Sequence, residues 1–212
     1  MARRKFLKLL TYLLFLSLCL GEAQARIGES RSTLEGRLLK DRQAIKVSSR
    51  KLPGLIEHKS VPYRRFLEYF PESAEHMVYY KPAEGEQAST DDLDVTFPDG
   101  WMLHVVYYKG RSVFEAYRRN GAGINRYEES GLLLRTKGES FWKNVDGKDR
   151  EETAMGYTME RDDGEIRANR QGNFMIFYMP EFDLAIKTQL DEENAEADEL
   201  AQEKAPDSLA GF

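Results

Sequence analysis

Residues able to act as nucleophiles, bases or metal ligands are few and widely spaced in this chain of 212 residues. The single cysteine, Cys19, lies in an apolar stretch close to the start. The three histidines, His58, His76 and His104, contain no pair at the i, i+4 spacing with which one helix face binds zinc. No Gly-x-Ser-x-Gly nucleophile motif is present. The sequence therefore predicts no catalytic residue, no metal site and no cofactor, and favours a protein that is not an enzyme.

Carboxylates, by contrast, are abundant: the 36 Asp and Glu residues could form many different pairs in the folded protein. A pair of facing carboxylates could hydrolyse a glycan, although the sequence singles out no pair. Asp91, Asp92 and Asp94 could suit calcium, but they lack the ordered spacing and glycine of an EF-hand loop. Solvated turn residues are the favoured interpretation of this cluster.

Aromatic residues gather in the middle of the sequence, around one expected β-meander. The favoured interpretation is that they pack a sheet against helices. The alternative is an exposed aromatic face beside Arg118 that binds a protein or a glycan. His104 falls within the same region, where a half-buried histidine with one hydrogen bond is favoured over a ligand or base. The candidate binding residues are Trp101, His104, Tyr107, Tyr117, Arg118 and Trp142.

Residues 1–25 have the pattern of a secretory signal peptide. Four basic residues precede an apolar run over 9–20, and Ala23-Gln24-Ala25 supplies the small residues of a cleavage site. The run is too short to span a bilayer, so we expect no transmembrane span. Lipid attachment at Cys19 is disfavoured because Leu18, rather than a small residue, precedes it. We expect a periplasmic or secreted protein, cleaved near Ala25 and without cysteine.

Charge is distributed unevenly along the expected mature chain. Its net charge is −8, of which residues 191–212 contribute −7. Residues 26–70 carry a net charge of +6, so this basic segment could contact anionic headgroups or the acidic tail. A nucleic-acid partner is disfavoured by export. The tail is Ala-rich and poor in aromatic residues, which predicts a solvated helix or disorder.

Hydrophobic periodicity predicts an α+β fold with an antiparallel sheet, a meander plus a hairpin, packed against two or three helices. Helices are expected from a capping box at Ser32 and Glu35, over residues 62–70, and from Asn125 with Glu128 to Gly138. Residues 182–186 alternate like a strand, with a helix left open. Residues 26–190 are expected to form one domain. Strands are expected over residues 76–81, 94–97, 101–108, 112–118, 157–160, 166–169 and 174–179.

Several of these segments together resemble a group of uncharacterised secreted bacterial proteins. The resemblance is carried by the opening Arg26-Ile27-Gly28-Glu29-Ser30, by the order strand, turn, strand, helix and Trp142, and by the closing hairpin over residues 161–179. Those proteins open with an Arg-x-Gly-Glu-Ser/Thr segment directly after the signal peptide. The resemblance implies a small secreted α+β domain of unknown role, with no catalytic residue to carry over. Lys40 stands where many of those proteins have a Tyr-Gly pair, so the first helix is expected to end differently.

Three functions remain open on this basis. The leading hypothesis is an exported, non-catalytic binding module of the bacterial envelope, with a protein or a glycan as partner. The second is a hydrolase that acts on envelope polymers through unidentified carboxylates. The third is an accessory of outer-membrane assembly. The oligomeric state is left open.

Overall fold

The computed structural model describes residues 27–40, 44–83 and 99–203. The expected signal peptide, the aspartates at 91, 92 and 94, and the strand expected at 94–97 lie outside these residues. In the described part of the chain, no helix is long and apolar enough to cross a membrane.

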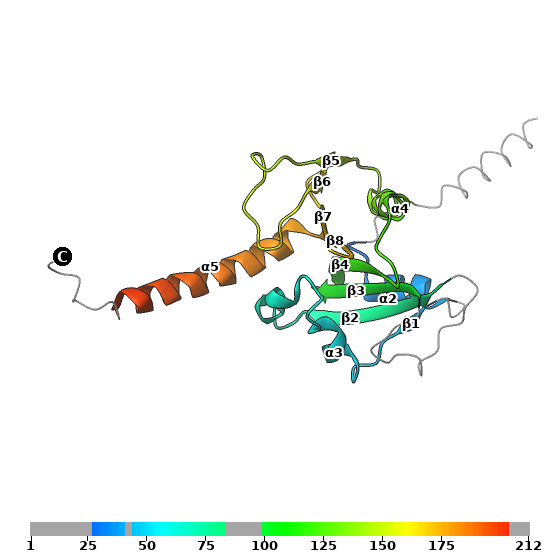
Figure 1. The fold of residues 1–212 in the computed structure, drawn as a ribbon, viewed down its shortest axis with the longest axis horizontal. Coiled ribbons are helices and arrows are strands. Elements are labelled where there is room, and N and C mark those ends of the chain that lie inside the picture. The colour runs from blue at the N-terminus through cyan, green and yellow to red at the C-terminus, as the bar shows by residue number, and fades with distance from the viewer. Residues whose placement is uncertain (1–26, 41–43, 84–98, 204–212) are drawn as a thin grey trace, which may run out of the picture.

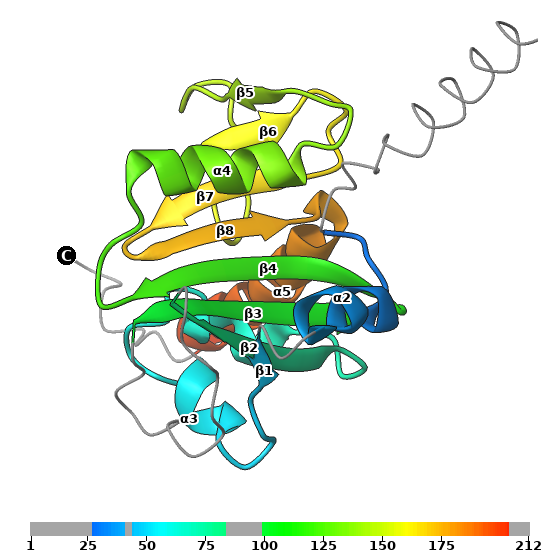
Figure 2. The same cartoon turned by 90° about the vertical axis from the view of Figure 1, so that its right-hand side faces the viewer.

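One eight-stranded sheet forms the centre of the molecule, in the order β1-β2-β3-β4-β8-β7-β6-β5, and every neighbouring pair is antiparallel (Figures 1 and 2). Two meanders, β2 to β4 and β5 to β8, meet where β4 pairs with β8. The predicted α+β class with an antiparallel sheet is therefore confirmed. The strands are β1 (Ile45–Lys46), β2 (Glu75–Pro82), β3 (Gly100–Tyr108), β4 (Arg111–Asn120), β5 (Trp142–Asn144), β6 (Met159–Arg161), β7 (Arg167–Gln171) and β8 (Phe174–Tyr178).

The β3–β4 hairpin is fixed by local backbone chemistry at both of its ends. Lys109 and Gly110 both have positive φ, 52° and 80°, as a two-residue turn between twisted strands requires. At the other end, a Cβ on Gly100 would lie 2.4 Å from the carbonyl oxygen of Lys81. Only glycine allows β2 and β3 to approach this closely.

Both faces of the sheet are covered by helices (Figure 2). One face, here called the α4 face, packs against α2 (Arg31–Leu38) and α4 (Arg126–Thr136) through Leu34 and Leu132. The opposite face, the α5 face, packs against the 3₁₀ helix η2 (Arg64–Tyr69) and the start of α5 (Pro180–Glu203). The short helix α3 (Leu52–Ile56) closes the α5 face beside β1 and β2.

Two helices differ in detail from the sequence prediction. The side chain of Ser30, rather than Ser32, caps α2 by accepting a hydrogen bond from the Thr33 amide, so this helix begins two residues earlier. The segment expected as a helix over 62–70 forms 3₁₀ turns instead of an α-helix. Three residues per turn place Tyr63 and Phe66 directly above one another, and both are buried.

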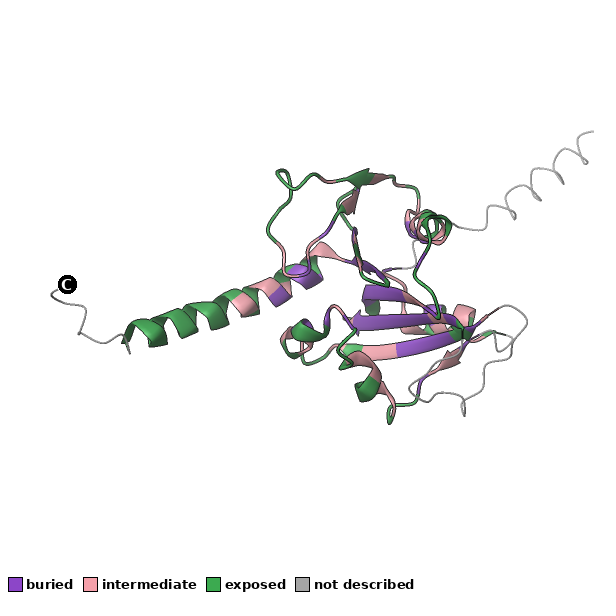
Figure 3. Ribbon diagram, in the orientation of Figure 1, coloured by how far each residue is buried: buried purple, intermediate pink, exposed green. Residues whose placement is uncertain are grey.

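Helix α5 continues without a break through residue 190 into the acidic segment. Phe182 and Ile186 are buried one helical turn apart, whereas Leu184 is 64% exposed. This spacing suits a helix and contradicts the strand alternation expected at 182–186. From Asp191 to Glu203 every residue is exposed, so the distal half of α5 projects from the body of the protein as a solvated helix (Figures 1 and 3).

We expect that a chain ending at Leu190 unfolds within about 2 °C of the full chain at low protein concentration. In the described part of the lost segment, residues 191–203, no apolar side chain is buried, and a hydrogen bond from the Tyr69 hydroxyl to the Glu193 carboxylate joins it to η2. Differential scanning calorimetry of both chains checks this prediction. A fall of more than about 5 °C would show instead that the tail is a structural part of the domain.

Candidate functional site

The six candidate binding residues lie on opposite faces of the sheet and do not form one cluster. His104 and Arg118 belong to the α5 face, because β3 and β4 alternate their side chains between the two sides. The α4 face carries the four aromatic residues Trp101, Tyr107, Tyr117 and Trp142.

Those four aromatic residues pack helices against the sheet. Tyr107 and Tyr117 are each 4% exposed, and the hydroxyl of Tyr117 donates to the carboxylate of Glu115 over 2.6 Å. Trp101 is half-buried in the same apolar layer. The indole of Trp142 donates to the Leu133 carbonyl oxygen over 2.8 Å and so anchors α4 to β5. Their contacts match the packing interpretation of the aromatic residues.

A buried carboxylate lies among these aromatics, where the sequence analysis had placed no special residue. Glu115 is fully buried in β4 and also accepts a hydrogen bond from the Ser112 hydroxyl over 3.1 Å. Nearby, Tyr79 donates to Glu35 on α2, and Arg31 binds the same carboxylate. Burial raises the pKa of Glu35, but these two hydrogen bonds outweigh it and leave the pKa below its usual value. The sequence signal was an acidic residue between apolar neighbours in a central strand.

On the α5 face, one phenol joins two histidines. The Tyr63 hydroxyl lies 2.6 Å from His104 Nδ1 and 3.1 Å from His76 Nε2. His104 and Tyr63 are fully buried, and the ring of Phe174 meets the ring of His104 edge-on at 5.7 Å. The sequence analysis selected His104 but missed Tyr63 and His76, because β2 and β3 bring His76 and His104 together only through their register.

Both histidines are held neutral by their surroundings. Burial lowers the pKa of His76 to about 4 and the pKa of His104 well below its usual range, and Arg118 adds to the effect on His104. The Tyr63 hydroxyl has one proton, so it donates to one ring and accepts from the other. The ring that accepts this proton must be neutral, and with the pKa values of both histidines lowered, the cluster is a pH-sensitive part of the core.

A pocket of about 380 Å³ opens where the segment after residue 26 crosses the start of β4. Two carboxylates line it, and each one is bound to an arginine. Glu29 lies 2.5 Å from Arg37, and Glu165 lies 3.2 Å from Arg161. Both carboxylates of the pocket are therefore engaged in ion pairs within the protein.

Helix α4 presents its outward side to solvent with an apolar stripe. The Asn125 side chain caps the helix by accepting from the Tyr127 and Glu128 amides, while the Asn125 amide donates to the Glu128 carboxylate. This is the capping box that the sequence predicted. Tyr127 is 89% exposed and Leu134 63% exposed, and their spacing of seven residues, two helical turns, places both on the same side.

Phe141 extends this stripe beyond the end of the helix. It is 66% exposed, and the ammonium of Lys137 lies 5.2 Å from the centre of its ring. Three of the five large apolar side chains that are exposed among the described residues therefore lie on α4 or within five residues of its end. The fourth and fifth, Leu184 and Leu200, lie on α5.

Positive charge borders the stripe on both sides. At 3.6 residues per turn, Arg126 and Lys137 fall on one side of Tyr127 and Leu134, and Arg135 falls on the other. Among the described residues, none of these three cations has a carboxylate within salt-bridge distance. The acidic residues of α4 are neutralised, because Arg119 binds Glu128 and Arg170 binds Glu129. We call Arg126, Tyr127, Leu134, Arg135, Lys137 and Phe141 the α4 surface.

The sequence analysis missed this surface, although a signal for it was present. Three consecutive leucines, Leu132, Leu133 and Leu134, span about 200° of a helix, more than one sheet can cover. Leu132 is buried, Leu133 is partly buried, and Leu134 is exposed.

Comparison with protein-family models, with curated proteins and with solved structures gave no match. Within the ranges that the structure describes, no group of three or more His, Cys, Asp and Glu side chains is arranged to hold a metal ion.

Proposed function

We propose that the protein is an exported, non-catalytic interaction module, and that the α4 surface binds its partner. The exported part of the proposal rests on the basic, apolar and small-residue pattern of residues 1–25 and on the resemblance to secreted bacterial proteins. The binding part rests on the geometry of α4.

One observation carries the proposal: Tyr127 and Leu134 are exposed on the same side of α4, Phe141 is exposed five residues after the helix ends, and the cations beside them have no carboxylate partner among the described residues. Exposed apolar residues that form a contiguous patch mark interaction sites more often than single exposed residues do. Tyr and Arg are also enriched at the centres of protein interfaces. Helix α4 is held rigidly by its capping box and by Trp142, so it offers a preformed surface.

A photo-crosslinking residue in place of Leu134 tests the proposal in cells that export the protein. We expect covalent adducts from position 134 and from position 127. The same residue in place of Lys59, which is exposed on the opposite side of the sheet, serves as the control and should give none. Equal adduct yields at all three positions, or none at 134 and 127, would refute the α4 surface as the binding site.

A further inference from the structure

The distal half of α5, residues 191–203, is an exposed helix of one charge. It carries seven acidic residues and no basic residue. Glu192, Glu196, Glu199 and Glu203 follow the i, i+4, i+7, i+11 spacing and so form one stripe along the helix, bordered by Leu200, which is 52% exposed. Like charges one turn apart destabilise a helix, so this stripe gains from contact with cations.

The α4 surface has the opposite charge and likewise places charged side chains next to exposed apolar ones. Arg126 and Lys137 lie on one side of its apolar stripe and Arg135 on the other, and the glutamate stripe of α5 likewise lies beside an apolar residue, Leu200. The 13 residues of the distal half extend about 20 Å, against about 17 Å for the 11 residues of α4, so the two helices match in length.

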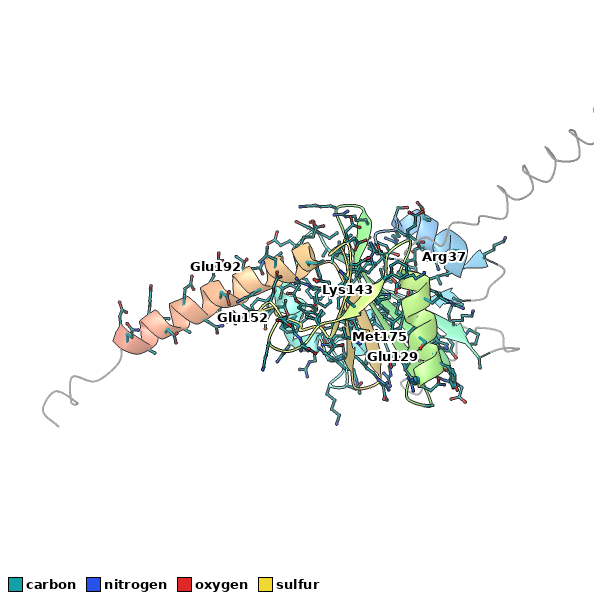
Figure 4. All side chains as sticks on the ribbon, turned by 90° about the horizontal axis from the view of Figure 1, so that it is seen from above. Arg37, Glu129, Lys143, Glu152, Met175 and Glu192 are labelled. Carbon is teal, nitrogen blue, oxygen red and sulfur yellow. The ribbon has the colours of Figure 1, made fainter. Side chains whose placement is uncertain are left out.

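One chain cannot bring these two elements together. Helix α4 packs on one face of the sheet through Leu132, and α5 leaves from the other face through Phe182 and Ile186. Figures 1 and 2 show α5 projecting away from the side that carries α4, and Figure 4 shows Glu192 and Glu129 on opposite sides of the body. A contact between them must therefore join two copies.

We propose that the distal half of α5 of one copy docks on the α4 surface of a second copy, so that the protein associates head to tail. This inference rests on the proposed function, because it uses the α4 surface as the binding site. Each copy carries both elements, and the contact does not pair one patch with itself. Such a heterologous contact gives rings or open chains. Opposite charges with few large apolar residues predict a weak contact that depends on salt.

Sedimentation velocity of the chain from Arg26 to Phe212, between about 5 μM and about 500 μM, measures this association. We expect the weight-average mass to rise at least about 1.5-fold over that range in about 50 mM salt and to return to the monomer value in about 500 mM salt. A monomer at every concentration in low salt would overturn the inference. It would leave the proposed function standing, because another partner could still occupy the α4 surface.

Charge reversal identifies the two partners of the contact. Arg126→Glu with Arg135→Glu reverses the α4 surface, and Glu196→Lys with Glu199→Lys reverses the distal half of α5. Each double variant alone should remain monomeric, and an equimolar mixture of the two should form heterodimers, because each then supplies the surface that the other lacks. Recovery in the mixture also shows that both variants are folded.

A matched control makes the same change in net charge at a different place on the protein. Lys59→Glu with Arg64→Glu changes two exposed cations on the opposite side and should associate as the unmodified chain does. Association that survives reversal of α5 but not of α4 would mean that two α4 surfaces pair with each other. That result overturns the inference and supports the proposed function. Association that survives reversal of α4 would overturn the inference and exclude the α4 surface as the self-association site.

Discussion

Between pH 6.5 and pH 4 the free energy of unfolding should fall by about 3 kcal/mol or more through the His76–Tyr63–His104 cluster alone. Burial lowers the pKa of His76 to about 4, and the pKa of His104 lies well below its usual range. As the pH falls through 6.5, the unfolded chain takes up protons that the folded chain cannot accept. Stability is therefore complete above pH 6.5 and is lost progressively toward pH 4. Urea unfolding at a series of pH values measures the loss.

Two substitutions separate the contribution of the cluster to the pH dependence of stability from that of carboxylates that titrate in the same pH range. His104→Asn keeps a polar atom near the position of Nδ1, and His76→Gln keeps one near Nε2, so each can still reach the Tyr63 hydroxyl. Neither side chain titrates. The double variant should lose about 3 kcal/mol less than the unmodified chain between pH 6.5 and pH 4, whereas His58→Gln, at an exposed position, should change nothing. An equally steep loss in the double variant would contradict the assignment.

The elements that the sequence predicted correctly are those with local determinants. The capping box at Asn125 lies within a few residues of the helix start that it specifies. The strands β2, β3 and β4 and the β7–β8 hairpin followed from local periodicity in the same way, whereas the pairing of β2 with β3 did not, because a strand over 94–97 was expected between them. The short edge strands β1 and β5 were not predicted, because two or three residues contain too little periodicity to separate a strand from a loop.

Residues 182–186 show why alternation alone misleads. Phe182, Leu184 and Ile186 alternate like a strand, yet Phe182 and Ile186 also lie one helical turn apart. The α5 face of the sheet provides a surface for one helical stripe, and Leu184 faces solvent instead. Whether the helical or the strand period applies depends on the surface against which the segment packs. A short stretch of sequence does not contain that information.

Non-local contacts also explain what was missed at the candidate sites. Alternation along β3 puts His104 on the side of Met102 and Val106, but His76 joins it only because Val78 pairs with His104 across the strands. The aromatic residues were selected for their number, and the structure uses them for packing. The exposed residues of α4 could be recognised only after the buried side of the helix was known.

Asp183 should be among the side chains whose loss costs the most stability. It is 2% exposed near the start of α5, and its carboxylate accepts the Met155 amide over 2.8 Å and the Ala154 amide over 3.1 Å. These two bonds attach the segment between β5 and β6 to α5. Asp183→Ala leaves two backbone N–H groups without their charged acceptor, so we expect it to lower the free energy of unfolding by about 2–4 kcal/mol.

Asp183→Asn removes the charge of the side chain but keeps part of its hydrogen bonding. Its amide oxygen can accept one of the two N–H groups while its amino group faces the other, so the expected loss is about half that of the alanine variant. Burial raises the pKa of Asp183, so the asparagine variant also avoids a buried charge. Glu192→Ala, at an exposed acidic residue of the same helix, should leave stability unchanged. Similar unfolding energies for Asp183→Ala and Glu192→Ala would show that the segment before β6 is held by its apolar contacts alone.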